Sequence, residues 1–336
     1  MWRRRVLNEV LTFVGCRNIK TQFVWALSAV RACSGPALPV HRITALQAVH
    51  SWSQHFQEEG VSEPDLSSRY ITAHVLGAKT IESVMAETLS ELLSPEKTQQ
   101  IWKLCAKRLQ RMPVQYVIEE WDFRDLTLKM RPPVFIPRPE TEELVEIVLS
   151  DLREKTESLS AVEVGCGSGA ISLSLLKSLP QLKAVALDQS ADAVSLTKEN
   201  ALSLGLEDRL QLYHLDIFKD AETVLKCCGG VPALVSNPPY LYTEDMSSLQ
   251  PEVQRFEDAA ALDGGADGLT AIRQVLSLAS QILLNHGRLY LEVDPRHPPL
   301  IRRWVESHLE TLHYVQTKHD FNNRPRFCIL QKEETN

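Results

Sequence analysis

A glycine-rich turn between an apolar run and a helical pattern constrains the fold of this chain most strongly. Residues 161–164 form a short apolar run interrupted only by Glu163, and residues 171–179 have the composition of a helix. The turn between them holds Gly165, Gly167 and Gly169. Glycines let the backbone pass close beneath a ligand, and the N-terminus of the following helix presents N–H groups to it. A nucleotide-binding α/β fold is therefore predicted, although several chemistries share such a turn.

The alternation of strand-like and helical segments continues beyond this turn. Apolar runs that predict strands lie at residues 183–187, 210–215, 231–235, 287–293 and 327–330. Strands that alternate with helices are typical of a doubly wound, mostly parallel sheet. The fold class predicted for this part of the chain is accordingly α/β.

Polar side chains lie at the ends of four successive predicted strands: Glu163, Asp188, Asp216 and Asn237. In an open α/β sheet, ligands bind at the carboxyl ends of the strands. Asp188 follows the glycine turn by about twenty residues, where a carboxylate can accept hydrogen bonds from ribose hydroxyls. A helix cap explains any one of these acids, but four unrelated caps at four strand ends do not explain the pattern.

The third of these strand ends also carries apolar side chains. Asp216 is followed by Ile217 and Phe218, which can flank an adenine ring. The sequence contains no Gly-Lys-Ser or Gly-Lys-Thr, so a phosphate-binding P-loop is not predicted. The predicted cofactor-binding residues are Glu163, Gly165, Cys166, Gly167, Ser168, Gly169, Asp188, Asp216, Ile217 and Asn237.

The sequence Asn237-Pro238-Pro239-Tyr240 follows the strand predicted at residues 231–235. Asparagine offers an acceptor and donors, the prolines remove two backbone donors, and tyrosine supplies a flat aromatic face. This set suits a planar NH2 group, because the carbonyl oxygens of Asn237 and Pro238 can accept its two hydrogens while Tyr240 packs on its plane. An ordinary turn at a strand end is the alternative. Asn237, Pro238 and Tyr240 are predicted to be catalytic, and all four residues to bind substrate.

These motifs together resemble the class I S-adenosylmethionine-dependent amino-methyltransferases. Residues 135–142, Phe-Ile-Pro-Arg-Pro-Glu-Thr-Glu, are similar to the signature of the release-factor glutamine methyltransferases of the HemK/PrmC type. Further similarity lies at residues 113–116 and 261–269, and the resemblance covers roughly residues 60–333. The chain departs from the family pattern at Glu257-Asp258, where Glu-Pro is usual, and at Asp294-Pro295, where a glycine is usual.

The resemblance implies a class I methyltransferase sheet with a small N-terminal helical domain, and S-adenosyl-L-methionine as the cofactor. The implied reaction is N5-methylation of the glutamine side chain in the Gly-Gly-Gln loop of mitochondrial class I peptide chain release factors. An adenine-N6 nucleic-acid methyltransferase is an alternative, because an adenine N6 amine presents the same planar group. A non-catalytic protein that keeps the cofactor pocket is a second alternative.

Charge is unevenly spread along the chain. The formal net charge of the 336 residues is -7, but residues 1–42 hold seven basic side chains and one acidic one. The rest of the chain therefore holds 29 basic and 42 acidic side chains. Because binding to nucleic acid relies on Lys and Arg at the phosphates, a direct nucleic-acid substrate is not expected.

The basic N-terminus has the pattern of a mitochondrial transit peptide. Arginines flank apolar residues that share one side of a helix, and this predicts import into the mitochondrial matrix. A secretory signal is disfavoured because Asn8 and Glu9 interrupt the apolar run, and a disordered cytosolic leader is the alternative. No membrane association is expected, since the apolar stretch at residues 23–30 is shorter than the roughly 20 residues of a spanning helix.

Four segments are predicted along the chain. They are a transit peptide and linker at residues 1–40, a helical substrate-binding domain at 41–115, a β-hairpin linker at 116–135, and the methyltransferase domain at 136–333. Helices of the second segment are expected to start near residues 43, 64 and 94, the last with Ser94 as N-cap before Pro95. The seven cysteines include no Cys-x-x-Cys pair, so a reducing compartment and no metal site are expected.

Overall fold

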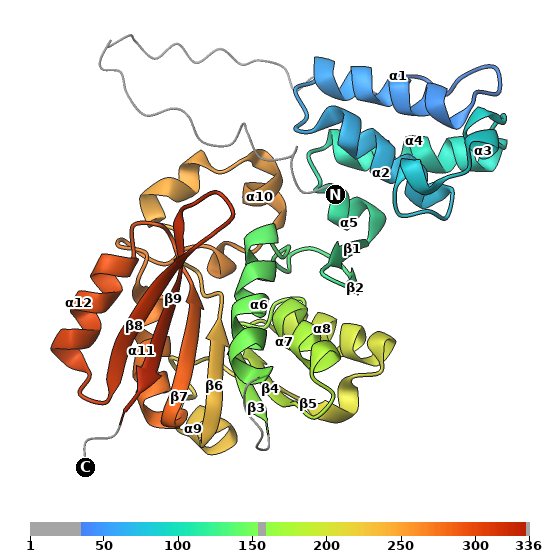
Figure 1. The fold of residues 1–336 in the computed structure, drawn as a ribbon. Coiled ribbons are helices and arrows are strands. Elements are labelled where there is room, and N and C mark those ends of the chain that lie inside the picture. The colour runs from blue at the N-terminus through green and yellow to red at the C-terminus, as the bar shows by residue number, and fades with distance from the viewer. Residues whose placement is uncertain (1–34, 154–158, 334–336) are drawn as a thin grey trace, which may run out of the picture. The chain divides into compact units, whose positions relative to one another are not determined.

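The protein is described from a computed structural model that covers residues 35–153 and 159–333 (Figure 1). Most of the predicted transit peptide, residues 1–34, lies outside the described residues. The described residues, 35–153 and 159–333, belong to one compact unit.

The N-terminal part of this unit is helical. Its helices are α1 (Ala45–Glu58), α2 (Pro64–Val75), α3 (Ala86–Ser90) and α4 (Pro95–Leu109), with a 3-10 turn η1 (Ile81–Ser83) before α3. The three helices predicted from sequence are confirmed, and α3 and η1 were not predicted. The Ser94 hydroxyl accepts a hydrogen bond from the Lys97 N–H at 3.3 Å, so this predicted N-cap is also confirmed. The helices pack around a core of their own, formed by Trp52, Phe56, Ile71, Ile101 and Cys105, among others.

The prediction of strand structure at residues 116–118 was wrong. These residues belong to α5 (Val114–Ile118), which Glu119 ends in a left-handed conformation at φ 63°. All three side chains are buried, with Tyr116 in one core and the other two in the helical core. In a strand, Tyr116 and Ile118 would have pointed to the same face and Val117 to the other. In the helix, Val117 and Ile118 instead share one core and Tyr116 lies in the other. The hairpin begins later and pairs β1 (Glu120–Phe123) with β2 (Leu126–Lys129).

A seven-stranded sheet organises the rest of the chain, in the order β5-β4-β3-β6-β7-β9-β8. The first five strands in that order are parallel, and β9 is antiparallel to both neighbours. The predicted doubly wound, mostly parallel sheet is thus confirmed. The strands are β3 (Ser160–Val164), β4 (Lys183–Asp188), β5 (Leu210–His214), β6 (Val231–Ser236), β7 (Leu283–Glu292), β8 (Leu312–His319) and β9 (Pro325–Lys332).

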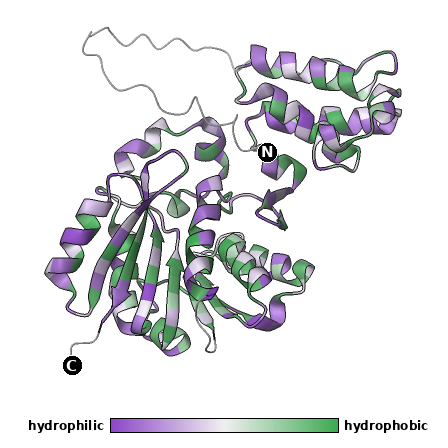
Figure 2. Ribbon diagram, in the orientation of Figure 1, coloured by the Kyte–Doolittle hydropathy of each residue, from purple (hydrophilic) through white to green (hydrophobic). Residues whose placement is uncertain are grey.

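Helices cover both faces of this sheet (Figure 1). Successive residues of β3 belong to different cores, because Ala161 packs with α6 and α7 and Val162 packs with α11 and α12. Strands buried on both faces are mostly apolar, and green segments lie along the strands in Figure 2. The helices are α6 (Pro139–Arg153), α7 (Ala170–Ser178), α8 (Ala191–Leu204), α9 (Ala221–Cys228), α11 (Thr270–Ile282) and α12 (Pro298–His308).

Short elements occupy the long connection between β6 and α11. They are η3 (Thr243–Ser248), α10 (Pro251–Phe256) and η4 (Ala259–Ala261). A further 3-10 turn, η2 (Glu207–Arg209), precedes β5.

A buried ion pair attaches α10 to the helical region. The Arg108 guanidinium donates to Glu252 Oε1 at 3.0 Å, and the two residues are 3% and 6% exposed. Arg108 also donates to the Ser67 hydroxyl at 3.0 Å, and the Ser62 hydroxyl donates to Glu252 Oε1 at 3.0 Å. Because a charge this deeply buried is strongly destabilising without a partner of opposite sign, the ion pair fixes α10 relative to α4.

We expect Glu252→Ala to lower the free energy of unfolding by about 3–5 kcal/mol, because it leaves the Arg108 charge buried without its partner. Glu82→Ala is the matched control, since the Arg69–Glu82 pair has a similar length of 2.8 Å but is exposed. Its removal should cost less than about 1 kcal/mol. Urea denaturation of the two variants checks this, and equal losses would contradict the role given to the buried pair.

Candidate functional site

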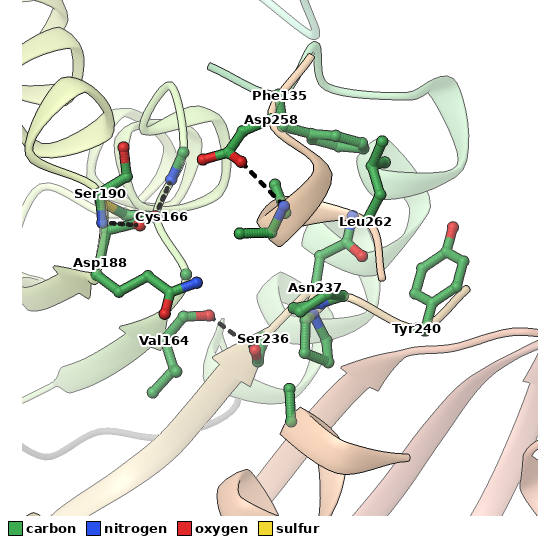
Figure 3. Close-up of a pocket in the computed structure, with 18 of the residues that line it drawn as sticks. Phe135, Val164, Cys166, Asp188, Ser190, Ser236, Asn237, Tyr240, Asp258 and Leu262 are labelled. Carbon is green, nitrogen blue, oxygen red and sulfur yellow. Dashed lines mark hydrogen bonds between the residues drawn. The ribbon is translucent and has the colours of Figure 1, made fainter. Parts of the chain in front are cut away.

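A cavity of about 330 Å³ lies at the carboxyl ends of β3, β4 and β6 and beside the segment that follows β5. A volume in this range suits a small-molecule ligand. Every site residue predicted from sequence lines the cavity except Gly169. Asp188 and Cys166 lie on one side of it, and Asn237 and Tyr240 on the other (Figure 3).

Gly169 lies behind the turn, against the protein interior. Its φ is 84°, and a Cβ added to it would approach Leu173 Cδ1 and Thr197 Cγ2 to 2.9 Å. Only glycine therefore fits at the N-cap of α7. This position packs the helix onto α8, while Gly165 and Gly167 line the cavity.

Asp188 ties the glycine turn to the end of β4. Its Oδ2 accepts a hydrogen bond from the Gly167 N–H and its Oδ1 from the Ser190 N–H, both at 2.9 Å. Burial raises the pKa of this carboxyl, while the two backbone hydrogen bonds oppose the rise. A carboxylate has about four lone-pair sites, so both oxygens can accept further bonds from a ligand.

Glu163 lies below the turn, one residue before the end of β3. It is 3% exposed, and its Oε2 accepts from both the N–H and the hydroxyl of Ser172. Burial raises the pKa of Glu163 to about 8. Glu163 thereby joins the strand to the first turn of α7 while still reaching the cavity wall.

Asp216 lies two residues beyond the end of β5. Its carboxylate accepts from the Phe218 N–H at 2.8 Å and pairs with Lys219 at 2.8 Å. The pKa of Asp216 is lowered, chiefly by the hydrogen bond from Lys219. Ile217 lines the cavity beside it, and Phe218 does so with 52% of its surface exposed.

The residues after β6 face this group across the cavity. Val164 of β3 pairs with Ser236, whose hydroxyl donates to the Val164 carbonyl at 2.7 Å. The Asn237 side-chain nitrogen donates to the Thr141 hydroxyl at 3.2 Å. The Tyr240 hydroxyl donates to Glu292 Oε1 at 3.4 Å. Hydrogen bonds to Thr141 and Glu292 therefore hold the side chains of the tetrapeptide in place.

Thr141 and Glu292 were not among the site residues predicted from sequence. Thr141 lies in the stretch at residues 135–142, whose resemblance to a signature was the available signal. Glu292 is the last residue of β7 and is buried at 1% exposure. Its position at a fifth strand end was the signal that the sequence offered.

The stretch at residues 135–142 also forms part of the cavity wall. Phe135 and Arg138 both line the cavity, and the Arg138 guanidinium lies 4.6 Å above the centre of the Phe135 ring. Glu257, which is buried, accepts from Arg138 at 2.7 Å and from the Ile136 N–H at 3.2 Å. The segment after α10 is thus joined to the start of α6.

Among the histidines, cysteines and carboxylates of the part of the chain that the structure describes, no group of three or more is arranged to bind a metal ion. Within residues 35–153 and 159–333, no helix is long and apolar enough to cross a membrane.

Comparison with known families places most of the described chain in two family models. Residues 47–118 match the model of the PrmC N-terminal domain, and residues 125–261 match that of the methyltransferase small domain. A human protein, MTRF1L release factor glutamine methyltransferase, is 44% identical over 316 residues, which cover 92% of each chain. Release factor glutamine methyltransferases from Moorella thermoacetica and Deinococcus radiodurans are 35% and 32% identical, over 87% and 81% of this chain and 100% and 93% of theirs.

We expect Asp188→Ala to weaken binding of S-adenosylmethionine by roughly 1.5–3 kcal/mol, because charged hydrogen bonds to the ribose would be lost. Asp192→Ala removes the same charge from the exposed first turn of α8 and serves as the control. Isothermal titration calorimetry measures both. If the affinity of Asp188→Ala equals that of the control, Asp188 only holds the turn.

Proposed function

The chain belongs to the release factor glutamine methyltransferase family, and on that basis we propose that it methylates the N5 atom of a release-factor glutamine. The observation that carries the proposal is the pairing of β3 with β6. It brings the glycine turn and Asn237-Pro238-Pro239-Tyr240 to one cavity. A cofactor side and an acceptor side then face each other.

S-adenosylmethionine fits the cofactor side. The backbone N–H groups of the turn and the Asp188 carboxylate would hold its amino acid and ribose portions, and Ile217 and Phe218 would flank its adenine. When bound, this cofactor supplies a methyl group made electrophilic by a positively charged sulfur. Because that charge already activates the methyl group, the reaction needs no metal.

The acceptor side orients a poor nucleophile. The lone pair of a glutamine amide nitrogen is delocalised into its carbonyl, so the nitrogen must be held in line with the methyl group. We assign this task to Asn237 Oδ1 and the Pro238 carbonyl, which accept the two amide hydrogens, and to Tyr240, which packs on the amide plane. Positioning can supply on the order of 7–11 kcal/mol of a barrier, and the acceptors stabilise the positive charge that grows on nitrogen.

We propose that the substrate is the glutamine of the Gly-Gly-Gln loop in a mitochondrial class I release factor. The name of the human relative supports a release factor as substrate. The acidic body of the chain, with 42 acidic and 29 basic side chains after residue 42, disfavours the alternative adenine acceptor. The helical region would contact the folded factor away from the loop.

Incubation with S-adenosylmethionine and an intact release factor should add about 14 Da, one methyl in place of one hydrogen, to that glutamine. Mass spectrometry locates it, and a short loop peptide should react more slowly because remote binding energy is missing. Methyl transfer to DNA, with none to the factor, would establish the adenine alternative instead.

Asn237→Ala should lower the rate of methyl transfer about 10²–10³-fold, while the affinity for the cofactor stays within a few-fold of the wild-type value.

We propose that the protein acts in the mitochondrial matrix, because residues 1–42 carry seven basic side chains and one acidic one. A fluorescent protein fused to these residues should enter mitochondria. Replacement of Arg3, Arg4 and Arg5 by Glu should prevent import, since import depends on positive charge along an amphipathic helix. Cytosolic fluorescence from the unmutated fusion would refute this localisation.

A further inference from the structure

A buried carboxylate lies behind the acceptor side of the cavity and has no part in the mechanism above. Glu292 is 1% exposed. Its Oε2 accepts a hydrogen bond from the Thr141 hydroxyl at 2.8 Å, and its Oε1 accepts one from the Tyr240 hydroxyl at 3.4 Å. Thr141 in turn accepts a bond from the Asn237 side-chain nitrogen at 3.2 Å. One carboxylate is therefore linked to both functional side chains of the Asn-Pro-Pro-Tyr motif.

The direction of these bonds follows from the number of protons available. A threonine hydroxyl has one proton, and an ionised carboxylate can only accept. Thr141 must therefore give its proton to Glu292, and toward Asn237 it can only accept. The Asn237 amide then has to point its nitrogen at Thr141, which turns Oδ1 away from Thr141.

We propose that Glu292 is a positioning residue for methyl transfer, which acts through Thr141 to keep Asn237 Oδ1 directed at the substrate amide. The proposal rests on the proposed function, because it concerns how Asn237 meets the acceptor NH2 group. The bond from Tyr240 to the same carboxylate also fixes the aromatic ring that covers the amide plane.

Loss of the negative charge would permit the opposite arrangement. A neutral carboxamide at position 292 can donate to the Thr141 oxygen, which frees the Thr141 proton to point at Asn237. The Asn237 amide would then rotate, and its nitrogen would face the NH2 group of the substrate. Two donors facing each other cannot form a hydrogen bond, so the substrate amide would lose one of its two acceptors.

Titratable groups from three segments of the chain surround Glu292. Tyr240 lies in the loop after β6, Arg326 belongs to β9 and Glu140 to α6. Burial raises the pKa of Glu292 to about 7, while the Thr141 bond and the Arg326 charge oppose the rise and Glu140 adds to it. Arg326 is itself fixed by bonds to the Val293 carbonyl at 3.1 Å and to Asp320 at 3.3 Å. The turnover number kcat should therefore fall as pH decreases through about 7, because a protonated Glu292 can donate to the Thr141 oxygen and so frees the Thr141 proton to point at Asn237.

Three variants of the full chain, assayed with intact release factor, test this positioning role. Glu292→Gln keeps the shape and removes the charge, while Thr141→Val keeps the shape and removes the hydroxyl. Each should lower kcat about 10²-fold, since small misplacements of reacting groups have effects of this size. The KM for release factor and the affinity for S-adenosylmethionine should stay near the wild-type values. Thr141→Ser restores a hydroxyl and should recover most of the kcat lost in Thr141→Val.

The pH profile separates positioning from general packing. The wild-type decrease in kcat below about pH 7 should be absent in Glu292→Gln and Thr141→Val and present in Thr141→Ser. Equal kcat losses in Thr141→Ser and Thr141→Val, or a Glu292→Gln protein with wild-type kcat, would overturn the positioning role and leave the proposed function intact. If Glu292→Gln does not fold, the two Thr141 variants decide the question. Failure of the wild-type protein to methylate a release factor would instead refute the proposed function.

Discussion

Parallel pairing of β3 with β6 is the contact on which the candidate site depends. Val164 is paired with Ser236, and the Ser236 hydroxyl donates to the Val164 carbonyl at 2.7 Å, so both strands end at the same level. The glycine turn and Asn237 therefore emerge side by side, and a Cβ added to Gly165 would lie 4.0 Å from the Asn237 carbonyl oxygen. A register shift of one residue would turn every side chain of β6 to the other face and separate the two halves of the site.

The two sides of the cavity use buried or partly buried carboxyl groups in the same way. Asp188 and Glu163 hold the glycine turn and the start of α7 through backbone and hydroxyl donors. Glu292 and Glu257 lie behind the acceptor side, where they hold Thr141 and Arg138. A carboxylate is stable in the interior only when donors surround it, so each of these acids fixes the donors around it. The geometry that positioning requires is then built before a ligand arrives.

The fold and most of the residues that line the cavity beside the glycine turn were predictable because local patterns encode them. The glycines, the apolar runs and the polar residue that ends each run all lie within short segments of sequence. The edge strand β8 was missed because it is partly exposed along its length and lacks a continuous apolar run. Thr141 and Glu292 could not be connected from sequence, since 151 residues separate them and only the folded sheet brings them together.

A crystal structure of the protein with an intact release factor and S-adenosylhomocysteine, the cofactor product, tests the central claim most directly. The account predicts that the glutamine nitrogen of the factor lies within about 3.2 Å of both Asn237 Oδ1 and the Pro238 carbonyl. The Asn237 nitrogen should still donate to Thr141 in that complex. A glutamine bound away from these two oxygens, or an Asn237 amide whose oxygen accepts from Thr141, would contradict it.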